Sequence, residues 1–126
     1  MKVTGFNINL TTDQMDAMNE FYGKTLGLTQ EPNSGGYEVS NGAYLHLDTH
    51  SETSGRTKEP ARLLVNFMVE DIKAEQAALE AKGVKFTRTE GIEYWGGKIS
   101  TFSDPDGNLL QIMQYDPSAD STSAQG

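Results

Sequence analysis

The sequence predicts an α+β fold of two βαβββ modules, with paired curved mixed sheets, helices on the outside and a concave inner groove. A strand pattern followed by a helical pattern occurs twice along the chain. Each helical pattern ends at a glycine, Gly27 or Gly83, and hairpin segments follow each of them. A module of roughly 60 residues buries too little surface to be stable alone, so the two sheets are expected to pair.

The first strand is predicted over residues 3–10. Alternation places Phe6, Ile8 and Leu10 on one face and both Asn7 and Asn9 on the other. Asparagine is unfavourable on the inward face of a strand unless it is paired or in contact with water. Two asparagines on this face therefore indicate a polar, water-accessible cavity.

A helix is predicted after the first strand of each module. Thr12 or Asp13 can cap the first helix, and apolar residues then recur at helical spacing: Met15, Met18, Tyr22 and Leu26. In the second module, residues 62–69 form the strand and Asp71 caps the helix.

Two turns identify the hairpins. Asn41-Gly42 favours a two-residue turn between strands at 37–40 and 43–47. Asp104-Pro105-Asp106-Gly107 favours a tight turn, because the proline fixes φ, Asp104 can accept hydrogen bonds within the turn, and Gly107 tolerates positive φ.

The strand after the second turn carries a polar residue among apolar ones. Gln111 shares a face with Leu109 and Met113. His46 holds the equivalent position in the first module, because the turn-and-strand segments of the two modules match. We therefore expect His46 and Gln111 to have related roles.

We expect residues 1–116 to form a single domain. Module 1 covers about residues 1–50, a linker rich in Ser, Thr and charge covers about 51–60, and module 2 covers about 61–116. Residues 117–126 lack large apolar side chains and are expected to form a flexible tail.

Composition excludes several classes of function. The net charge of -8 and pI near 4.6 argue against nucleic acid or an anionic membrane as a partner. Without cysteine the chain has no disulfide and no thiolate nucleophile or metal ligand. It shows no apolar signal core and no apolar run of membrane-spanning length, so a cytoplasmic location is expected.

Motifs between residues 3 and 115 resemble the vicinal oxygen chelate superfamily, which includes glyoxalases, bleomycin-resistance proteins and extradiol dioxygenases. In order they are Phe21-Tyr22, Leu26-Gly27-Leu28, Trp95-Gly96-Gly97 and Asp104-Pro105-Asp106-Gly107-Asn108-Leu109-Leu110. The resemblance implies the fold given above and a homodimer. Because function varies widely on this fold, the fold alone does not name a reaction.

The resemblance also implies four positions that hold the ligands in metal-binding members, typically His on the first strand and Glu on the last strand of each module. Here these positions are Asn7, His46, Leu64 and Gln111. A long first helix leaves Gly5 or Asn9 open as the first of them. Catalytic divalent metals prefer imidazole and carboxylate ligands, and no carboxylate is present, so no metal and no other cofactor is expected.

The candidate ligand-binding residues are Asn7, Asn9, His46, Tyr94, Trp95, Phe102 and Gln111. His46 is also the candidate catalytic residue, because histidine titrates near neutrality and can act as a general base.

Each of these candidates has a structural alternative. His46 can be a half-buried histidine bonded to a neighbour, and Gln111 can satisfy a backbone group across the sheet. The pair Tyr94-Trp95, which the resemblance puts near the pocket mouth, can stack on a planar ligand or simply pack beside a glycine bulge. Tyr37 and Tyr44 are further options for the inner face.

Three functions stay open. The first is a metal-free protein of the bleomycin-resistance type that binds a small aromatic or cationic molecule in the groove between the sheets. The alternative is a lyase, isomerase or dioxygenase of the glyoxalase type, with a weak metal site or with His46 as general base. A regulatory or accessory domain that binds a metabolite without transforming it is a third option, so whether the chain is an enzyme stays open.

Overall fold

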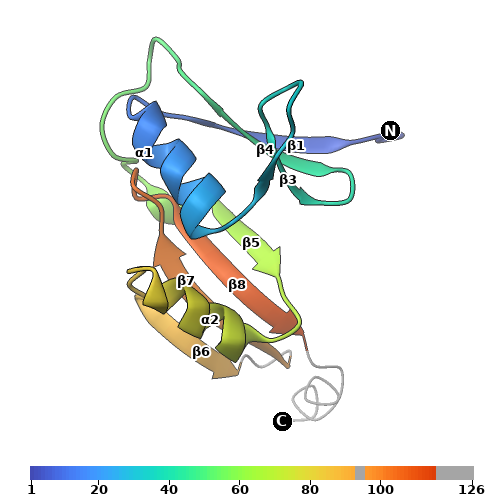
Figure 1. The fold of residues 1–126 in the computed structure, drawn as a ribbon, viewed down its shortest axis with the longest axis vertical. Helices are drawn as coiled ribbons and strands as arrows, with labels where there is room; N and C mark the ends of the chain where they lie inside the picture. The colour runs from blue at the N-terminus through green and yellow to red at the C-terminus, as the bar shows by residue number, and fades with distance from the viewer. Residues whose placement is uncertain (93–95, 116–126) are drawn as a thin grey trace. The chain divides into compact units, whose positions relative to one another are not determined.

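The computed structural model describes residues 1–92 and 96–115, and the chain divides into two compact units, Met1–Thr57 and Lys58–Gly126. The boundary lies within the segment 51–60 that the sequence predicts as a linker. Figure 1 shows the helices and strands of each unit. Within the described ranges, no helix has the length and apolar character needed to cross a bilayer.

Each unit contains one four-stranded mixed sheet. In the first unit the strand order is β1 (Phe6–Thr11), β4 (Ala43–Asp48), β3 (Tyr37–Ser40) and β2 (Thr29–Gln30). In the second it is β5 (Leu64–Met68), β8 (Leu109–Tyr115), β7 (Gly97–Ser103) and β6 (Arg88–Ile92). The first and last strands of each unit are parallel and the other pairs are antiparallel. The predicted α+β fold with two repeated modules is confirmed; the groove between the sheets stays a prediction.

One face of the first sheet packs against the helical segment α1 (Met15–Glu20) and its continuation. The core there consists of Met18, Tyr22, Tyr37 and Leu45, each at most 3% exposed. The Tyr37 hydroxyl donates to Asn19 Oδ1 over 2.6 Å, which ties β3 to the helix. Tyr37 is therefore a core residue and does not lie on the inner face of the sheet.

The first helix differs from its prediction at its start, whereas its predicted stop at Gly27 is confirmed. Gln14 is the N-cap residue and makes no side-chain cap bond. Thr12 Oγ1 instead accepts from the Gln14 amide, and Asp13 Oδ2 accepts from the Gly55 amide. After Glu20 the chain continues as a π-helix, Phe21–Thr25, before it ends at Gly27 with φ of 71°.

The helix of the second unit, α2 (Ile72–Ala81), agrees with its prediction. Asp71 Oδ1 accepts from the Ala74 amide over 3.1 Å, so the predicted cap is confirmed. The helix covers one face of its sheet (Figure 1), where Ser100 donates to Gln76 Oε1 over 2.6 Å. The core beneath it contains Val65, Ile72, Leu79, Phe102, Leu110 and Ile112. A short 3-10 helix, Pro60–Arg62, precedes β5.

The predicted turn before β8 is confirmed in detail. Asp104 is 4% exposed, and its Oδ1 accepts from the amides of Asp106 (2.9 Å) and Asn108 (3.0 Å). Its Oδ2 accepts from Asn108 Nδ2 over 2.8 Å. Gly107 has a φ of 84°, a conformation that only glycine adopts without cost. This turn fixes where β8 begins and so which face Gln111 occupies.

Candidate functional site

The face of the first sheet opposite the helix is polar. In the parallel pairing of β1 with β4, Asn7 lies opposite Tyr44 and Asn9 lies opposite His46. On β3, Glu38 lies opposite Tyr44. Register partners point to the same face of a sheet, so these five side chains share one surface.

Part of this surface is hollowed. The hollow has a volume of about 450 Å³ and is lined by Thr4, Gly5, Phe6, Asn7, Gly42, Tyr44 and His46. It therefore brings together two of the predicted site residues, Asn7 and His46. Asn9 shares the face but does not line the hollow.

His46 is held by packing and its ring nitrogens carry no hydrogen bond among the described residues. Its ring lies against the backbone of Gly36, where an added Cβ would approach the imidazole Cε1 to 2.5 Å. The ring centroids of Tyr44 and His46 are 6.5 Å apart, with an interplanar angle of 42°. The alternative that His46 is bonded to a neighbouring residue is therefore not supported within the described part of the chain.

The segment that supplies Gly36 is itself tightly bonded. Glu31 accepts from the backbone amides of Asn33 (3.1 Å) and Ser34 (2.7 Å) through its carboxylate. The Glu31 amide donates to the Gly36 carbonyl over 2.7 Å, which closes the loop. The amide bonds, that of Ser34 first, hold the pKa of Glu31 below its ordinary value. Glu31 is thus an ionised support for the wall against which His46 packs.

The electrostatic environment of the polar face is negative. The pKa of Tyr44 is raised, first by the charge of Glu38, then by desolvation and by its hydrogen bond to Glu38, and also by the charge of Glu31. The Tyr44 hydroxyl donates to Glu38 Oε2 over 3.4 Å. An electron-rich ring beside two carboxylates favours a cation over an anion.

The second sheet carries an equivalent polar pair. Asn66 on β5 lies opposite Gln111 on β8, as Asn9 lies opposite His46 in the first unit. Gln111 Nε2 donates to Thr101 Oγ1 over 3.1 Å, so its NH₂ group bonds a side chain rather than a backbone group. Asn66 was not predicted as a site residue, although its place in the repeat matches that of Asn9. Gly36 and Glu38 carry no comparable signal in the sequence.

The four remaining residues singled out in the sequence have different outcomes. The prediction of Phe102 as a ligand contact is wrong, because it pairs with Leu110 on the helix-covered face and is 0% exposed. Its ring packs on that of Phe86, with centroids 5.1 Å apart. Tyr94 and Trp95 lie outside the described residues. Leu64 lies on the face of Gln111, opposite Leu109.

The positions equivalent to the family's metal ligands do not fit a catalytic divalent metal. Asn7 and Gln111 offer neutral amide groups, His46 offers one imidazole, and Leu64 offers no donor atom. The described residues also contain no group of three or more His, Asp or Glu side chains placed to hold a metal ion.

Comparison with known families identifies the repeat. The model of the Glyoxalase/Bleomycin resistance protein/Dioxygenase superfamily matches residues 6–112. The chain belongs to this superfamily. The match confirms the resemblance that the motifs indicate in the sequence.

Solved structures share the glyoxalase-superfamily fold at low sequence identity. A glyoxalase/bleomycin resistance protein/dioxygenase from Nocardioides is 21% identical with a TM-score of 0.69, over 93% of this chain and 86% of that one. A glyoxalase/dioxygenase from Nostoc punctiforme is 20% identical with a TM-score of 0.71, over 87% and 89%. An integron cassette protein from V. Cholerae is 21% identical with a TM-score of 0.66, over 92% and 98%. Identities at this level establish the fold alone.

A comparison with curated protein sequences finds no significant match.

Proposed function

We propose that this glyoxalase-superfamily chain is a binding protein that holds a small organic cation on the polar face of β1 and β4. The observation that carries the proposal is the hollow of about 450 Å³ lined by Asn7, Tyr44 and His46. The side chains of Asn7 and His46 have no hydrogen-bond partner among the described residues, so they are available to a ligand. Sites for small molecules commonly have a volume of roughly 300–1,000 Å³ and a few polar groups that fix orientation.

Charge decides which ligand is favoured. The carboxylates of Glu38 and Glu31 both act on Tyr44, and the whole chain carries a net charge of -8. A cation centred over the face of the Tyr44 ring gains from the ring quadrupole as well as from these carboxylates. An aromatic group on the same ligand can pack against the Tyr44 and His46 rings.

A matched pair of probes tests the proposal. Benzyltrimethylammonium and neopentylbenzene have nearly the same shape and differ in one positive charge. We expect calorimetric titration to show binding of benzyltrimethylammonium that weakens as salt is added, and markedly weaker binding of neopentylbenzene. Equal affinity for the two probes would contradict a cation site.

Two variants locate the site. Glu38→Gln removes the carboxylate whose charge contributes most to the raised pKa of Tyr44. This variant is expected to weaken cation binding by about three- to tenfold. Glu20→Gln removes the same charge from the exposed surface of α1 and serves as the control. If both variants weaken binding equally, the effect is one of net charge and the proposed site is wrong.

A second candidate is an enzyme of the glyoxalase type in which His46 is a general base. It is favoured by one observation: the imidazole lines the hollow with no hydrogen bond to another described residue, so it can reach a bound substrate. His46→Gln should then abolish turnover of oxo-substrates while the fold stays intact. Turnover that survives this change, or that is undetectable even with added nickel, zinc, manganese or iron, rules this candidate out.

The metal-free state, the homodimer and the cytoplasmic location expected from the sequence are part of the same proposal. The donor chemistry at Asn7, His46, Leu64 and Gln111 supports the first of these. Sedimentation velocity at increasing protein concentration tests the homodimer, and a single monomeric species at every concentration would contradict it.

A further inference from the structure

The tip of the β3–β4 hairpin exposes an asparagine that is followed by a glycine. Asn41 and Gly42 are both exposed, and Asn41 is the only one of the seven asparagines in the chain that precedes a glycine. Gly42 has a φ of 81°, and its carbonyl accepts from the Phe6 amide over 3.2 Å. The Gly42 amide itself donates to no group within residues 1–92 and 96–115. The backbone nitrogen next to the Asn41 side chain is therefore unbonded, and no Cβ shields it.

We propose that Asn41 is a site of spontaneous covalent modification, since asparagine is among the thermolabile residue types. The Gly42 nitrogen forms a bond to Asn41 Cγ, the bond from Cγ to the side-chain NH₂ breaks, and ammonia leaves with the Gly42 amide proton. One water molecule then opens the resulting five-membered imide. Opening at Cγ leaves an aspartate at this position, and opening at the main-chain carbonyl leaves an isoaspartate. Water is the only co-reactant, and no group is oxidised or reduced.

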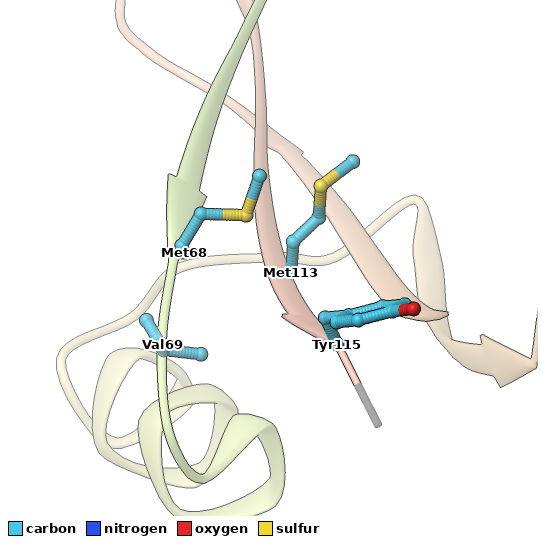
Figure 2. A pocket seen from close by; sticks show the side chains of 4 residues that line it. All are labelled: Met68, Val69, Met113 and Tyr115. Atoms are coloured by element: carbon cyan, nitrogen blue, oxygen red, sulfur yellow. The ribbon is translucent and has the colours of Figure 1, made fainter. Parts of the chain in front are cut away.

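The equivalent turn of the second module is protected from this reaction. Asp106-Gly107 lies just before β8, as Asn41-Gly42 lies just before β4, and an aspartate can form the same imide with loss of water. However, Asp106 is 4% exposed, and the Gly107 amide donates to the Asp104 carbonyl over 2.9 Å. The strand β8 then leads to a hollow of about 460 Å³, whose lining Figure 2 shows: Met68, Val69, Met113 and Tyr115. Each module thus has a glycine turn before a strand that lines a hollow, and the first turn leaves the glycine nitrogen unbonded.

A second exposed asparagine, Asn33, provides a matched comparison within the same unit. The amide that follows it, that of Ser34, donates to Glu31 Oε2 over 2.7 Å. A nitrogen held in a hydrogen bond has to give up that bond before it can attack a side chain. Asn33 is therefore expected to convert more slowly than Asn41, although both are exposed loop residues.

Conversion of Asn41 acts on the hollow of the first unit, because Gly42 is one of its lining residues. Either product adds one negative charge beside that residue, which favours a bound cation. This consequence rests on the proposed function, whereas the modification itself does not. The isoaspartyl product also adds one CH₂ to the main chain of the turn, so it disturbs the bond from the Phe6 amide to the Gly42 carbonyl.

Ageing of the full chain in mildly alkaline buffer tests the modification, with peptide mapping by mass spectrometry as the measurement. We expect the peptide that holds Asn41 to gain the mass of an amide-to-acid change, at least about tenfold faster than the peptide that holds Asn33. The products should be two isomers that chromatography separates. Asp106 should form isoaspartate only when the chain is aged in denaturant. Asn41→Gln should abolish the reaction, because its longer side chain would need a six-membered ring. Conversion of Asn41 as slow as that of Asn33 would overturn the inference.

The variant Asn41→Asp tests the effect on the hollow separately. It carries the charge of the aspartyl product and should bind benzyltrimethylammonium about two- to threefold more tightly than the unchanged chain. Ala77→Glu adds the same charge on the exposed surface of α2 and should leave the affinity unchanged. Equal affinities of Asn41→Asp and the unchanged chain would overturn the link to the hollow. If the unchanged chain binds no cation, the proposed function fails, whereas the mass measurement still decides whether Asn41 is modified.

Discussion

His46 shows how a site residue can be positioned by a neighbour that has no side chain. The imidazole occupies the space that a Cβ on Gly36 would take, and the loop that carries Gly36 is closed by the bonds of Glu31. Gly36 has no positive φ, so the backbone itself does not require glycine there. Glycine is needed at this position because the His46 ring approaches the backbone too closely to leave room for a Cβ.

Gly36→Ala is therefore expected to displace the His46 ring and to lower the free energy of unfolding by about 1–2 kcal/mol. Chemical denaturation measures the loss, and the His46 ring resonances report the displacement. Gly5→Ala is the control, because a Cβ at Gly5 meets no atom within 4 Å. Equal stability of the two variants would show that His46 does not depend on Gly36.

At the scale of elements, the Asp104 turn decides the register of β8. One buried carboxylate accepts three hydrogen bonds within the turn, from the amides of Asp106 and Asn108 and from Asn108 Nδ2. Asp104→Ala leaves these donors unpaired and should cost about 2–4 kcal/mol of unfolding free energy. Asp104→Asn keeps the acceptor for the two amides and should cost about 1 kcal/mol. Chemical denaturation with both variants checks the order, and a negligible loss for Asp104→Ala would contradict it.

The loop between β2 and β3 is a second element whose contribution to stability can be tested, in this case through its dependence on pH. The pKa of Glu31 is lowered because its ionised carboxylate accepts backbone bonds in the folded chain. Its stabilisation is therefore complete above the ordinary carboxyl pKa and is lost as pH falls through the lowered value. Glu31→Gln should lower the melting temperature at neutral pH. In acid, the difference in melting temperature between this variant and the unchanged chain should vanish. The control Glu20→Gln should give a small difference that does not follow this course.

The sequence predicted the elements better than it predicted which side chains meet. The repeat, the Asp71 cap and the turn at Asp104 depend on local chemistry, and all three are confirmed. The face of Phe102 depends on how β7 pairs with β8, which no local pattern fixes, and its prediction as a ligand contact is wrong. The contact of His46 on β4 with Gly36, in the loop before β3, has no signal in the sequence.

At the scale of the whole molecule, two sheets of one topology carry different chemistry on equivalent strands. Asn9 and His46 lie on the polar face of the first sheet, whereas Asn66 and Gln111 border an apolar hollow in the second. The two modules therefore share a topology but present different side chains at equivalent positions, and the fold alone does not name a ligand. Family membership alone does not decide whether the chain binds or transforms its ligand.

Metal content is the whole-chain measurement that tests the metal-dependent form of the enzyme. A firmly held catalytic divalent metal needs several imidazole or carboxylate ligands, because only these offset the loss of its hydration. The family-equivalent positions supply one imidazole and two amides. We expect the purified chain to hold less than one equivalent of metal by elemental analysis after dialysis. One full equivalent, retained after dialysis and lost in His46→Ala, would show that His46 belongs to a metal centre and would favour the enzyme over the binding protein.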